Sequence, residues 1–255
     1  MLMQKIKKAF LILKKGDIKD FLNKFSAYFN NKLNFFSIPF VINKVGEIKE
    51  SFEKSGDVNE LFDVVSAVAV ISSTQIKSEI TKLLEILRSR NINSVLEIGT
   101  ATGGSIFLFS EVVNDKARLV TVDMHSKLFG YGYPSWRIPI YKSFPRGKQI
   151  INLIRGDSHT AETLKDVKMA LVGEKVDFLF IDGDHSYEGV KKDFEMYGPL
   201  VKSGGVVAFH DIVDGPEAFV GGVPRFWKEI KNNYKHDELV ENWKQGGLGI
   251  GILYL

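Results

Sequence analysis

From Thr74 onwards, apolar residues follow two alternating patterns. Helical spacing predicts helices over 74–90, 103–113, 160–172, 186–201 and 224–234. Short apolar runs predict strands over 94–99, 117–123, 149–155, 176–182, 206–211, 236–241 and 248–255. Strands that alternate with helices form a mostly parallel sheet covered on both faces. We therefore predict a doubly wound, Rossmann-like α/β fold with a mostly parallel seven-stranded sheet.

Residues 1–73 have a different pattern, rich in Lys, Phe and Asn. They predict an N-terminal helical extension, broken at 16–17, near Pro39 and at 55–57, followed by a main domain over 74–255. The first fifteen residues carry five lysines and no acid, with apolar residues at helical spacing between them: Ile6, Phe10 and Leu13. This segment fits a solvated helix packed on the main domain. The alternative is a basic amphipathic helix that contacts an anionic membrane surface or a partner protein.

Composition narrows the function classes. The chain has 255 residues, 44% hydrophobic and 25% charged, with a net charge of +3, which is ordinary for a soluble globular protein. The absence of cysteine excludes disulfides, thiolate nucleophiles and cysteine zinc sites. No apolar run approaches the ~20 residues of a membrane span, and the apolar stretch 9–13 is shorter than the ~7–15 residues of a signal-peptide core. We expect a cytoplasmic protein, with the inner membrane face as a peripheral contact.

Acids and histidines stand at the ends of the predicted strands: Glu97, Asp123, Asp157, Asp182 and the pair His210-Asp211. In doubly wound sheets, ligands bind at the carboxyl ends of the strands. Charged groups at positions covered by helices are costly unless a partner compensates them. The functional site is therefore expected at this edge.

A glycine turn, residues 99–105, links the first strand to a helix. It is not the dinucleotide G-x-G-x-x-G, and a plain strand-to-helix turn has a similar pattern. Glu97 would repel a pyrophosphate but suits a ligand with a cationic end. Asp123 can accept hydrogen bonds from ribose hydroxyls, and Asp157-Ser158 can contact an adenine amino group. A ligand with a cationic end, a central ribose and an adenine is S-adenosylmethionine (SAM).

Five segments in order, 95–105, 122–123, 155–158, 180–189 and 204–211, resemble the class I SAM-dependent methyltransferases. The resemblance covers residues 74–255 and is closest to the branch with sugar O-methyltransferases and cephalosporin-hydroxylase-like proteins. It implies methyl transfer to a hydroxyl of a sugar, glycan or related small molecule. With the reasoning above, the expected cofactor contacts are Gln75, Glu97, Gly99, Thr100, Gly103, Gly104, Ser105, Asp123, Met124, Asp157, Ser158 and Asp182. The turn departs from the common glycine spacing at 100–102.

The ends of the fourth and fifth parallel strands carry candidate metal ligands. Carboxylates and an imidazole that converge are costly unless a cation joins them, and oxygen ligands favour Mg²⁺. Helix capping and a buried core histidine explain the same residues without a metal. Members that resemble catechol O-methyltransferase hold a metal at positions that match Asp182, His210 and Asp211, although histidine is unusual for Mg²⁺.

Methyl transfer to a hydroxyl requires removal of its proton, by a base or with the help of a metal. His185 and His210 are the candidate bases, with Asp184 or Asp211 orienting an imidazole. His159 follows Asp157-Ser158 and is either a neighbour of the adenine or a helix-cap neighbour.

The long loop 125–148 interleaves aromatic and basic residues. Long loops in compact domains are usually functional, so it predicts either a lid that stacks on the ring of the acceptor or a segment packed on its own core. Segment 214–224 is expected to complete the acceptor pocket.

Other function classes stay open. A nicotinamide-dependent oxidoreductase conflicts with Glu97 and with the missing dinucleotide motif. A metal-dependent hydrolase built on Asp182, Asp184, His185 and Asp211 leaves the glycine turn unexplained, and a non-enzymatic adapter with the same fold would not turn over cofactor. Near-neutral charge outside the N-terminus disfavours nucleic acid as a partner, and the sequence is compatible with a homo-oligomer.

Overall fold

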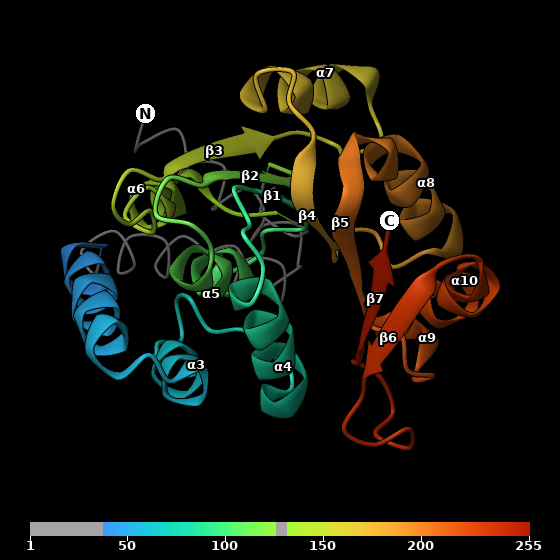
Figure 1. Ribbon diagram of the computed structural model, residues 1–255, viewed down its shortest axis with the longest axis horizontal. Coiled ribbons are helices and arrows are strands. Elements are labelled where there is room, and N and C mark those ends of the chain that lie inside the picture. Colours follow the sequence, from blue (N-terminus) through green and yellow to red (C-terminus); the bar gives the residue numbers. More distant parts are fainter. Residues whose placement is uncertain (1–37, 126–131) are drawn as a thin grey trace, which may run out of the picture.

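A computed structural model of the chain describes residues 38–125 and 132–255. Seven strands form one sheet in the order β3-β2-β1-β4-β5-β7-β6 (Figure 1). The strands are β1 (Ser94–Ile98), β2 (Arg118–Asp123), β3 (Ile150–Arg155), β4 (Val176–Ile181), β5 (Val201–His210), β6 (Lys235–Leu239) and β7 (Ile250–Tyr254). Strands β1 to β5 pair in parallel, whereas β7 runs antiparallel to β5 and β6. The predicted mostly parallel seven-stranded sheet is confirmed.

Helices cover both faces of the sheet (Figure 1). The first face carries α3 (Val58–Ser66), α4 (Lys77–Arg88) and α5 (Gly104–Val112), and the second carries α7 (Ala161–Ala170), α8 (Tyr187–Tyr197) and α10 (Val223–Ile230). Successive strand residues point to opposite faces. In β4, Phe178 and Phe180 pack into the first core cluster, whereas Leu179 and Ile181 pack into the second. Short helical turns fill the connections: Ser135–Arg137, α6 (Ile138–Tyr141), Gly198–Leu200, α9 (Glu217–Val220) and Lys231–Asn233.

The described part of the N-terminal extension is helical over 38–55 and packs on the main core. Its residues Val41, Val45 and Ile48 belong to the same cluster as α4 and α5. The chain breaks at the predicted position, because Asp57 caps α3 by accepting a hydrogen bond from Asn59 N at 2.8 Å. The basic segment lies outside the described residues, and the boundary at residue 73 stays a prediction.

Helix α4 begins at Lys77, three residues after the expected start at Thr74. The preceding segment is held against the glycine turn instead. Thr102 Oγ1 donates to Ser72 O at 2.6 Å, and a β-carbon at Gly104 would lie 2.8 Å from Ser73 N. This close backbone contact draws residues 72–76 out of the helix.

Strand β5 begins at Val201, so the turn predicted at 203–205 lies within the strand. The register between β4 and β5 shifts between Val176 and Phe178. Such an irregularity accommodates extra residues in one strand, and Gly204 adopts a φ of +77°, which glycine tolerates without strain.

Loop 125–148 is largely part of the core where it is described. Tyr133, Tyr141 and Phe144 are fully buried, and the ring centroids of Tyr133 and Tyr141 lie 5.0 Å apart. An exposed aromatic lid is therefore wrong for 132–148, while residues 126–131 lie outside the described part. Aromatic residues alone did not distinguish a lid from a packed segment.

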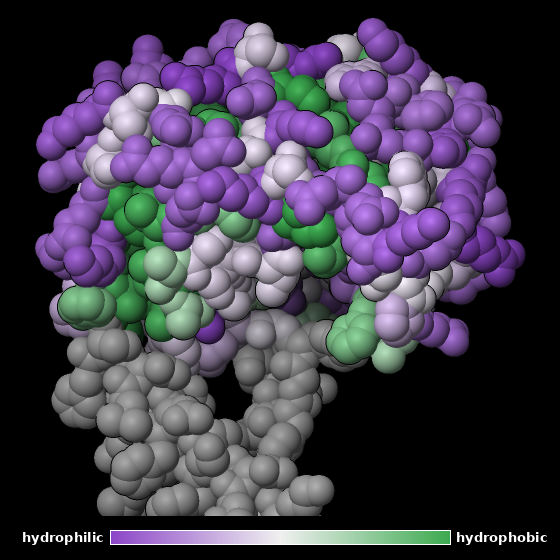
Figure 2. All heavy atoms as spheres, turned by 90° about the horizontal axis from the view of Figure 1, so that it is seen from below, coloured by the Kyte–Doolittle hydropathy of each residue, from purple (hydrophilic) through white to green (hydrophobic). Residues whose placement is uncertain are grey.

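The surface seen from below is mainly hydrophilic, and hydrophobic side chains emerge there in scattered patches (Figure 2). Among the residues that the structure describes, no helix is both long and apolar enough to cross a bilayer.

Candidate active site

The parallel register brings the ends of β4 and β5 together. Ile181 pairs with Phe209, so the residues that follow, Asp182 and His210, are neighbours at the carboxyl edge. Asp182 Oδ1 lies 3.2 Å from His210 Nδ1. The predicted meeting of these two strand ends is thus a direct result of the sheet.

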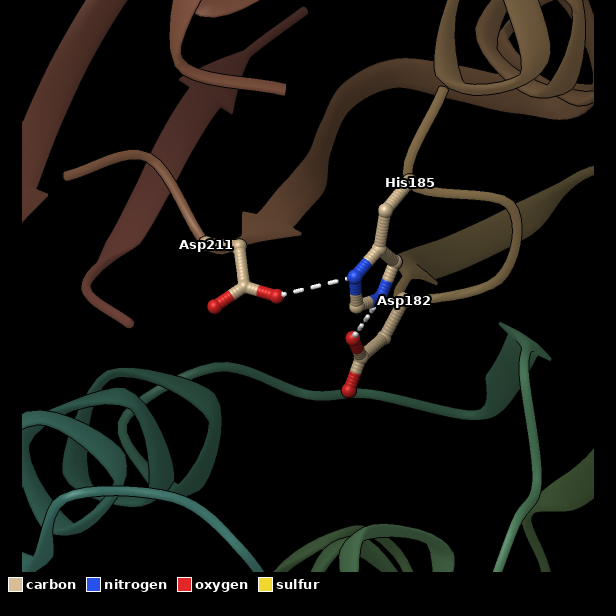
Figure 3. Close-up of side chains that lie close together, drawn as sticks. All are labelled: Asp182, His185 and Asp211. Carbon is tan, nitrogen blue, oxygen red and sulfur yellow. Dashed lines mark ion pairs between the residues drawn. The ribbon is translucent and has the colours of Figure 1, made fainter. Parts of the chain in front are cut away.

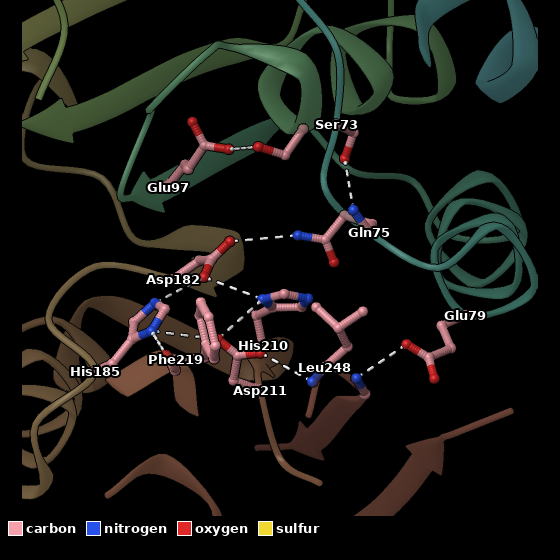
Figure 4. Close-up of polar contacts among 12 residues, drawn as sticks. Ser73, Gln75, Glu79, Glu97, Asp182, His185, His210, Asp211, Phe219 and Leu248 are labelled. Atoms are coloured by element: carbon pink, nitrogen blue, oxygen red, sulfur yellow. Dashed lines mark hydrogen bonds and ion pairs between the residues drawn. The ribbon is translucent and has the colours of Figure 1, made fainter. Parts of the chain in front are cut away.

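Two carboxylates and two imidazoles converge here, and we call Asp182, His185, His210 and Asp211 the acid–histidine cluster (Figures 3 and 4). His185 Nε2 lies 3.4 Å from Asp182 Oδ1, and His185 Nδ1 lies 3.3 Å from Asp211 Oδ2. His210 Nδ1 lies 3.6 Å from the same oxygen of Asp211. Each imidazole therefore contacts both carboxylates.

Mutual attraction sets the protonation of the cluster. Burial works to raise the pKa of Asp182, but the charges and hydrogen bonds of His210 and His185 outweigh it and hold that pKa well below its usual range. The hydrogen bond to Asp182 outweighs burial and raises the pKa of His185 to about 9. Burial works to lower the pKa of His210, but Asp182 and Asp211 raise it to about 10. Both imidazoles are therefore cationic at neutral pH in the ligand-free chain.

Backbone groups fix the cluster from the side of segment 214–224. His185 Nδ1 lies 2.5 Å from the carbonyl oxygen of Phe219, whose side chain is 71% exposed. Asp211 has a φ of +63°, unusual for a residue with a β-carbon, and its Oδ1 accepts a hydrogen bond from Leu248 N at 3.0 Å. Asp184 is exposed and accepts from Ser186 N at 2.9 Å, at the entry to α8. The orienting contacts to the imidazoles thus come from Asp182 and Asp211.

Three residues of the cluster have possible metal-ligating atoms that lie close together. One atom each of Asp182, His185 and Asp211 lies within 4.8 Å of the others (Figure 3). This group contains His185 and not His210, which was expected from the sequence as a ligand; the Nε2 of His210 is buried with no hydrogen-bond partner among the described residues. Two carboxylates and one imidazole suit a divalent cation. The Phe219 carbonyl would orient the histidine ligand, as such partners commonly do.

Glu97, near the end of β1, is fully buried beside the glycine turn. Its carboxylate accepts hydrogen bonds from Ser105 Oγ at 2.5 Å and from Thr121 Oγ1 at 2.7 Å. Thr121 Oγ1 in turn lies 2.5 Å from Thr100 Oγ1. Burial raises the pKa of Glu97 to about 8, despite these hydrogen bonds. A cation nearby would favour the ionised form.

The glycines of the turn are required by the protein itself. Gly99 has a φ of +97°, and a β-carbon there would lie 2.0 Å from the carbonyl oxygen of Asp182. Gly103 has a φ of +82°, and a β-carbon there would lie 2.6 Å from the ring of Tyr141. The turn is thus pressed between the end of β4 and the buried aromatic residues, which fixes its position at the site.

The remaining predicted cofactor residues lie around this turn. Asp123 accepts from Ala101 N and from Met124 N, each at 2.7 Å, so β2 is tied to the turn. Gln75 Nε2 lies 3.3 Å from Asp182 Oδ2 (Figure 4), and its buried Oε1 has no hydrogen-bond partner among the described residues.

Asp157 and Ser158 lie beyond β3, at the entry to α7. Asp157 Oδ1 accepts from His159 N at 2.8 Å, and Ser158 O accepts from the hydroxyl of Tyr197 at 2.6 Å. Helix α8, which carries Tyr197, therefore supports this turn.

Glu79, which was not among the residues predicted from the sequence, supports the site from a distance. It is buried on α4 and accepts hydrogen bonds from Glu241 N and Gly249 N, each at 3.0 Å. The loop between β6 and β7 that it holds includes Leu248, the partner of Asp211. A signal was present, because Glu79 interrupts the apolar face of its helix. The role of Phe219 O had no sequence signal, since it is a backbone contact.

Two family models match parts of the chain. Residues 96–212 match a family model described as a methyltransferase domain, and residues 48–132 match one described as protein-L-isoaspartate(D-aspartate) O-methyltransferase. The chain is also 28% identical over 160 residues to the uncharacterized protein y4gI of Sinorhizobium fredii, a match covering 58% of this chain and 16% of that protein. It is 49% identical over 39 residues to protein R132 of Acanthamoeba polyphaga mimivirus, 15% of this chain and 18% of that one. The chain spans less than a fifth of these relatives.

Solved structures share the fold. An O-methyltransferase from Bacillus cereus in complex with SAH is similar with a TM-score of 0.53 and 20% identity, over 78% of this chain and 90% of that chain. The O-methyltransferase TomG from Streptomyces achromogenes, involved in tomaymycin synthesis and solved with SAM, is similar with a TM-score of 0.53 and 17% identity, over 84% and 89%.

Proposed function

Because residues 96–212 match a methyltransferase-domain family model, we propose that the chain is a class I SAM-dependent methyltransferase that methylates a hydroxyl oxygen of a sugar, glycan or related small molecule. The observation that carries this proposal is the convergence of two imidazoles and two carboxylates beside the glycine turn. Such a cluster can hold and move the proton that a hydroxyl must lose. A nitrogen or thiol acceptor would need less help from a base.

The residues around the turn fit the cofactor. Asp182 supplies negative charge, and Glu97 would ionise beside a cationic ligand. The Oε1 of Gln75, which has no hydrogen-bond partner among the described residues, supplies an acceptor in the same region. Asp123 lies where the ribose hydroxyls would bind, and Asp157-Ser158 lies where the adenine would bind. When bound, SAM supplies a methyl group on a positively charged sulfur.

The chain's own residues then handle the proton. Asp182 accepts from His210 Nδ1, which leaves the buried Nε2 to receive the proton of the acceptor hydroxyl. As the oxygen takes the methyl group, the proton moves to this nitrogen, and the two carboxylates stabilise the resulting imidazolium. In the ligand-free chain both imidazoles are already protonated. Additional positive charge in the cluster would lower their pKa values and prepare this acceptor nitrogen.

A divalent cation such as Mg²⁺ fits the same cluster. Asp182, His185 and Asp211 would hold it, and it would lower the pKa of a coordinated hydroxyl. His210 would then be the one member of the cluster that does not bind the metal, and it would remain available to accept the proton.

The test is methyl transfer from methyl-labelled SAM to a panel of acceptors: methyl glycosides, nucleotide sugars and catechol. Each reaction is run with Mg²⁺ and with EDTA, and products are identified by mass spectrometry. We expect label in a methyl ether of a sugar, stimulated by Mg²⁺. The variant His236→Gln, which changes a histidine far from the cluster on β6, is the matched control for His210 variants. Label on nitrogen, or SAM binding without turnover on any acceptor, would contradict the proposal.

A further inference from the structure

A second buried acid–histidine pair lies outside the acid–histidine cluster. Asp193, on the inner side of α8, is fully buried, and its Oδ1 lies 3.2 Å from His159 Nε2. His159 directly follows the turn Asp157-Ser158. The proposed chemistry uses neither residue of this pair.

The pair belongs to a set of contacts that fix this turn to α8. His159 Nε2 also lies 3.2 Å from the carbonyl oxygen of Gly189. Both neighbours of this nitrogen are acceptors, so it carries a proton. Tyr197, one helical turn after Asp193, donates to Ser158 O at 2.6 Å. Two residues of α8 therefore hold two successive residues of the turn.

Asp193 also contacts the loop that leaves β4. A β-carbon at Gly183 would lie 3.2 Å from Asp193 Oδ2, and Gly183 is the residue after Asp182. The same carboxylate therefore lies between the turn at β3 and the loop of the acid–histidine cluster. A shift of Asp193 would therefore be felt both at the turn after β3 and at the loop after β4.

A carboxylate at this place is costly for folding. Burial raises the pKa of Asp193 to about 6, opposed by the Ser158 side chain and by the charge of His159. A buried acid is weak evidence for a role in stability, because apolar residues of similar size often stabilise a core more. Its effect is to fix the orientation of Ser158 and His159.

We propose that His159 and Asp193 are positioning residues that hold the Asp157-Ser158 turn in the arrangement that binds the adenine of the cofactor. The inference rests on the proposed function, because it presumes that SAM or its product S-adenosylhomocysteine (SAH) binds across these strands. It adds two residues to the cofactor site, and neither contacts the cofactor itself.

Calorimetric titration of SAH into the full chain tests this. We expect His159→Gln and Asp193→Asn each to weaken SAH binding about tenfold, the scale of one lost hydrogen bond to a charged group. Binding of S-inosylhomocysteine, in which a carbonyl replaces the adenine amino group, distinguishes a positioning role from a general loss of folding. The wild type should prefer SAH over this analogue, and both variants should lose part of that preference. Glu195→Gln, which removes an exposed carboxylate from the same helix, should change neither value.

A pH series adds an independent readout. As the pH falls through about 6, Asp193 gains a proton and loses the negative charge that faces His159, so the wild-type affinity for SAH should fall. Asp157 and Asp184 also face this pair and are unchanged in Asp193→Asn, so the difference between the wild type and this variant isolates Asp193. If Asp193→Asn folds poorly by circular dichroism, His159→Gln and Tyr197→Phe test the same contacts.

The outcomes separate the two proposals. A wild type that binds neither SAM nor SAH would overturn the proposed function. A wild type that binds SAH, with folded variants that keep its affinity within twofold and its preference for adenine, would overturn the positioning role alone.

Discussion

His185 Nδ1 lies 2.5 Å from the carbonyl oxygen of Phe219. A carbonyl only accepts hydrogen bonds, so this nitrogen carries a proton and Nε2 is the atom that faces Asp182. His210 has the opposite arrangement, since its Nδ1 contacts Asp182 and its Nε2 is free of protein partners among the described residues. Under the proposed function, these two rings have different tasks. His185 presents a ligand atom to a metal, and His210 presents a nitrogen to the acceptor.

The variant His210→Ala should lower turnover at least about 100-fold, the lower range for a lost acid–base group. Binding of SAH should survive, because the imidazole does not belong to the expected cofactor contacts. Steady-state kinetics with the acceptor that the labelling panel identifies, together with calorimetry for SAH, measure the two effects. His236→Gln should match the wild type in both. Near-normal turnover of His210→Ala would reject its role in proton transfer.

The variant Asp211→Asn should weaken Mg²⁺ binding at least about tenfold, because even outer partners of metal ligands have effects of that size. Asp184→Asn is the matched control, since this neighbouring acid bonds to Ser186 N rather than to the cluster. Calorimetric titration of Mg²⁺, with and without SAH, makes the measurement. If the wild type shows no binding in either condition, the metal is absent from the mechanism and the cluster works as an acid–base pair alone.

Glu97 should make SAM binding depend on pH. Its pKa is raised by burial to about 8, so in the ligand-free chain it is mostly protonated at neutral pH. A cationic ligand favours the ionised form, so SAM affinity should rise between about pH 6 and 8, at most about tenfold per pH unit. The variant Glu97→Gln should show a flat profile over this range.

The raised pKa of Glu97 also predicts how the stability of the fold depends on pH. The protonated form is favoured in the ligand-free fold, so the contribution of Glu97 to stability is fully present below its ordinary pKa and is lost as the pH rises through about 8. The Tm of Glu97→Gln relative to the wild type should therefore increase from pH 6 to pH 9. An unchanged difference would mean that water reaches this carboxylate.

The sheet and its edge could be predicted from the sequence because apolar runs determine both. Once the strand that ends at Ile181 lies beside the strand that contains Phe209, their next residues must meet. The type of residue at each strand end then indicates the chemistry. Gly99 and Gly103 also correctly indicated a turn that another group approaches closely. The structure shows that these groups are the backbone of Asp182 and the ring of Tyr141.

The loops could not be predicted in the same way. Tyrosine occurs both in lids and in packed cores, so the residue type does not decide between them. Only the packed structure shows that Tyr133 and Tyr141 are buried. The contact between Phe219 O and His185 depends on how α9 folds back, and any residue at 219 provides a carbonyl oxygen. The start of α4 was predicted three residues early because local capping preference ignores the turn that holds Ser72.

Glu79 offers a test of how firmly the rim of the site is held. It accepts hydrogen bonds from Gln245 Nε2 at 2.8 Å and from the backbone of Glu241 and Gly249. Glu79→Ala leaves buried donors unpaired and should lower the free energy of unfolding by about 3 kcal/mol. Glu79→Gln keeps one acceptor oxygen and should lose less. Glu85→Ala, on the exposed side of the same helix, should stay within about 0.5 kcal/mol of the wild type.

Urea denaturation of the ligand-free chain ranks these variants. The effect should extend to function, because the loop that Glu79 holds also donates Leu248 N to Asp211. Turnover of Glu79→Gln should therefore fall at a temperature where the variant is fully folded, with SAH affinity unchanged. The loop lies against segment 214–224, which is expected to complete the acceptor pocket: a β-carbon at Gly215 would lie 2.5 Å from the carbonyl oxygen of Gly246. Equal losses of stability in Glu79→Ala and Glu85→Ala would show that the loop is held by its own turn, and that Asp211 keeps its unusual φ without help from α4.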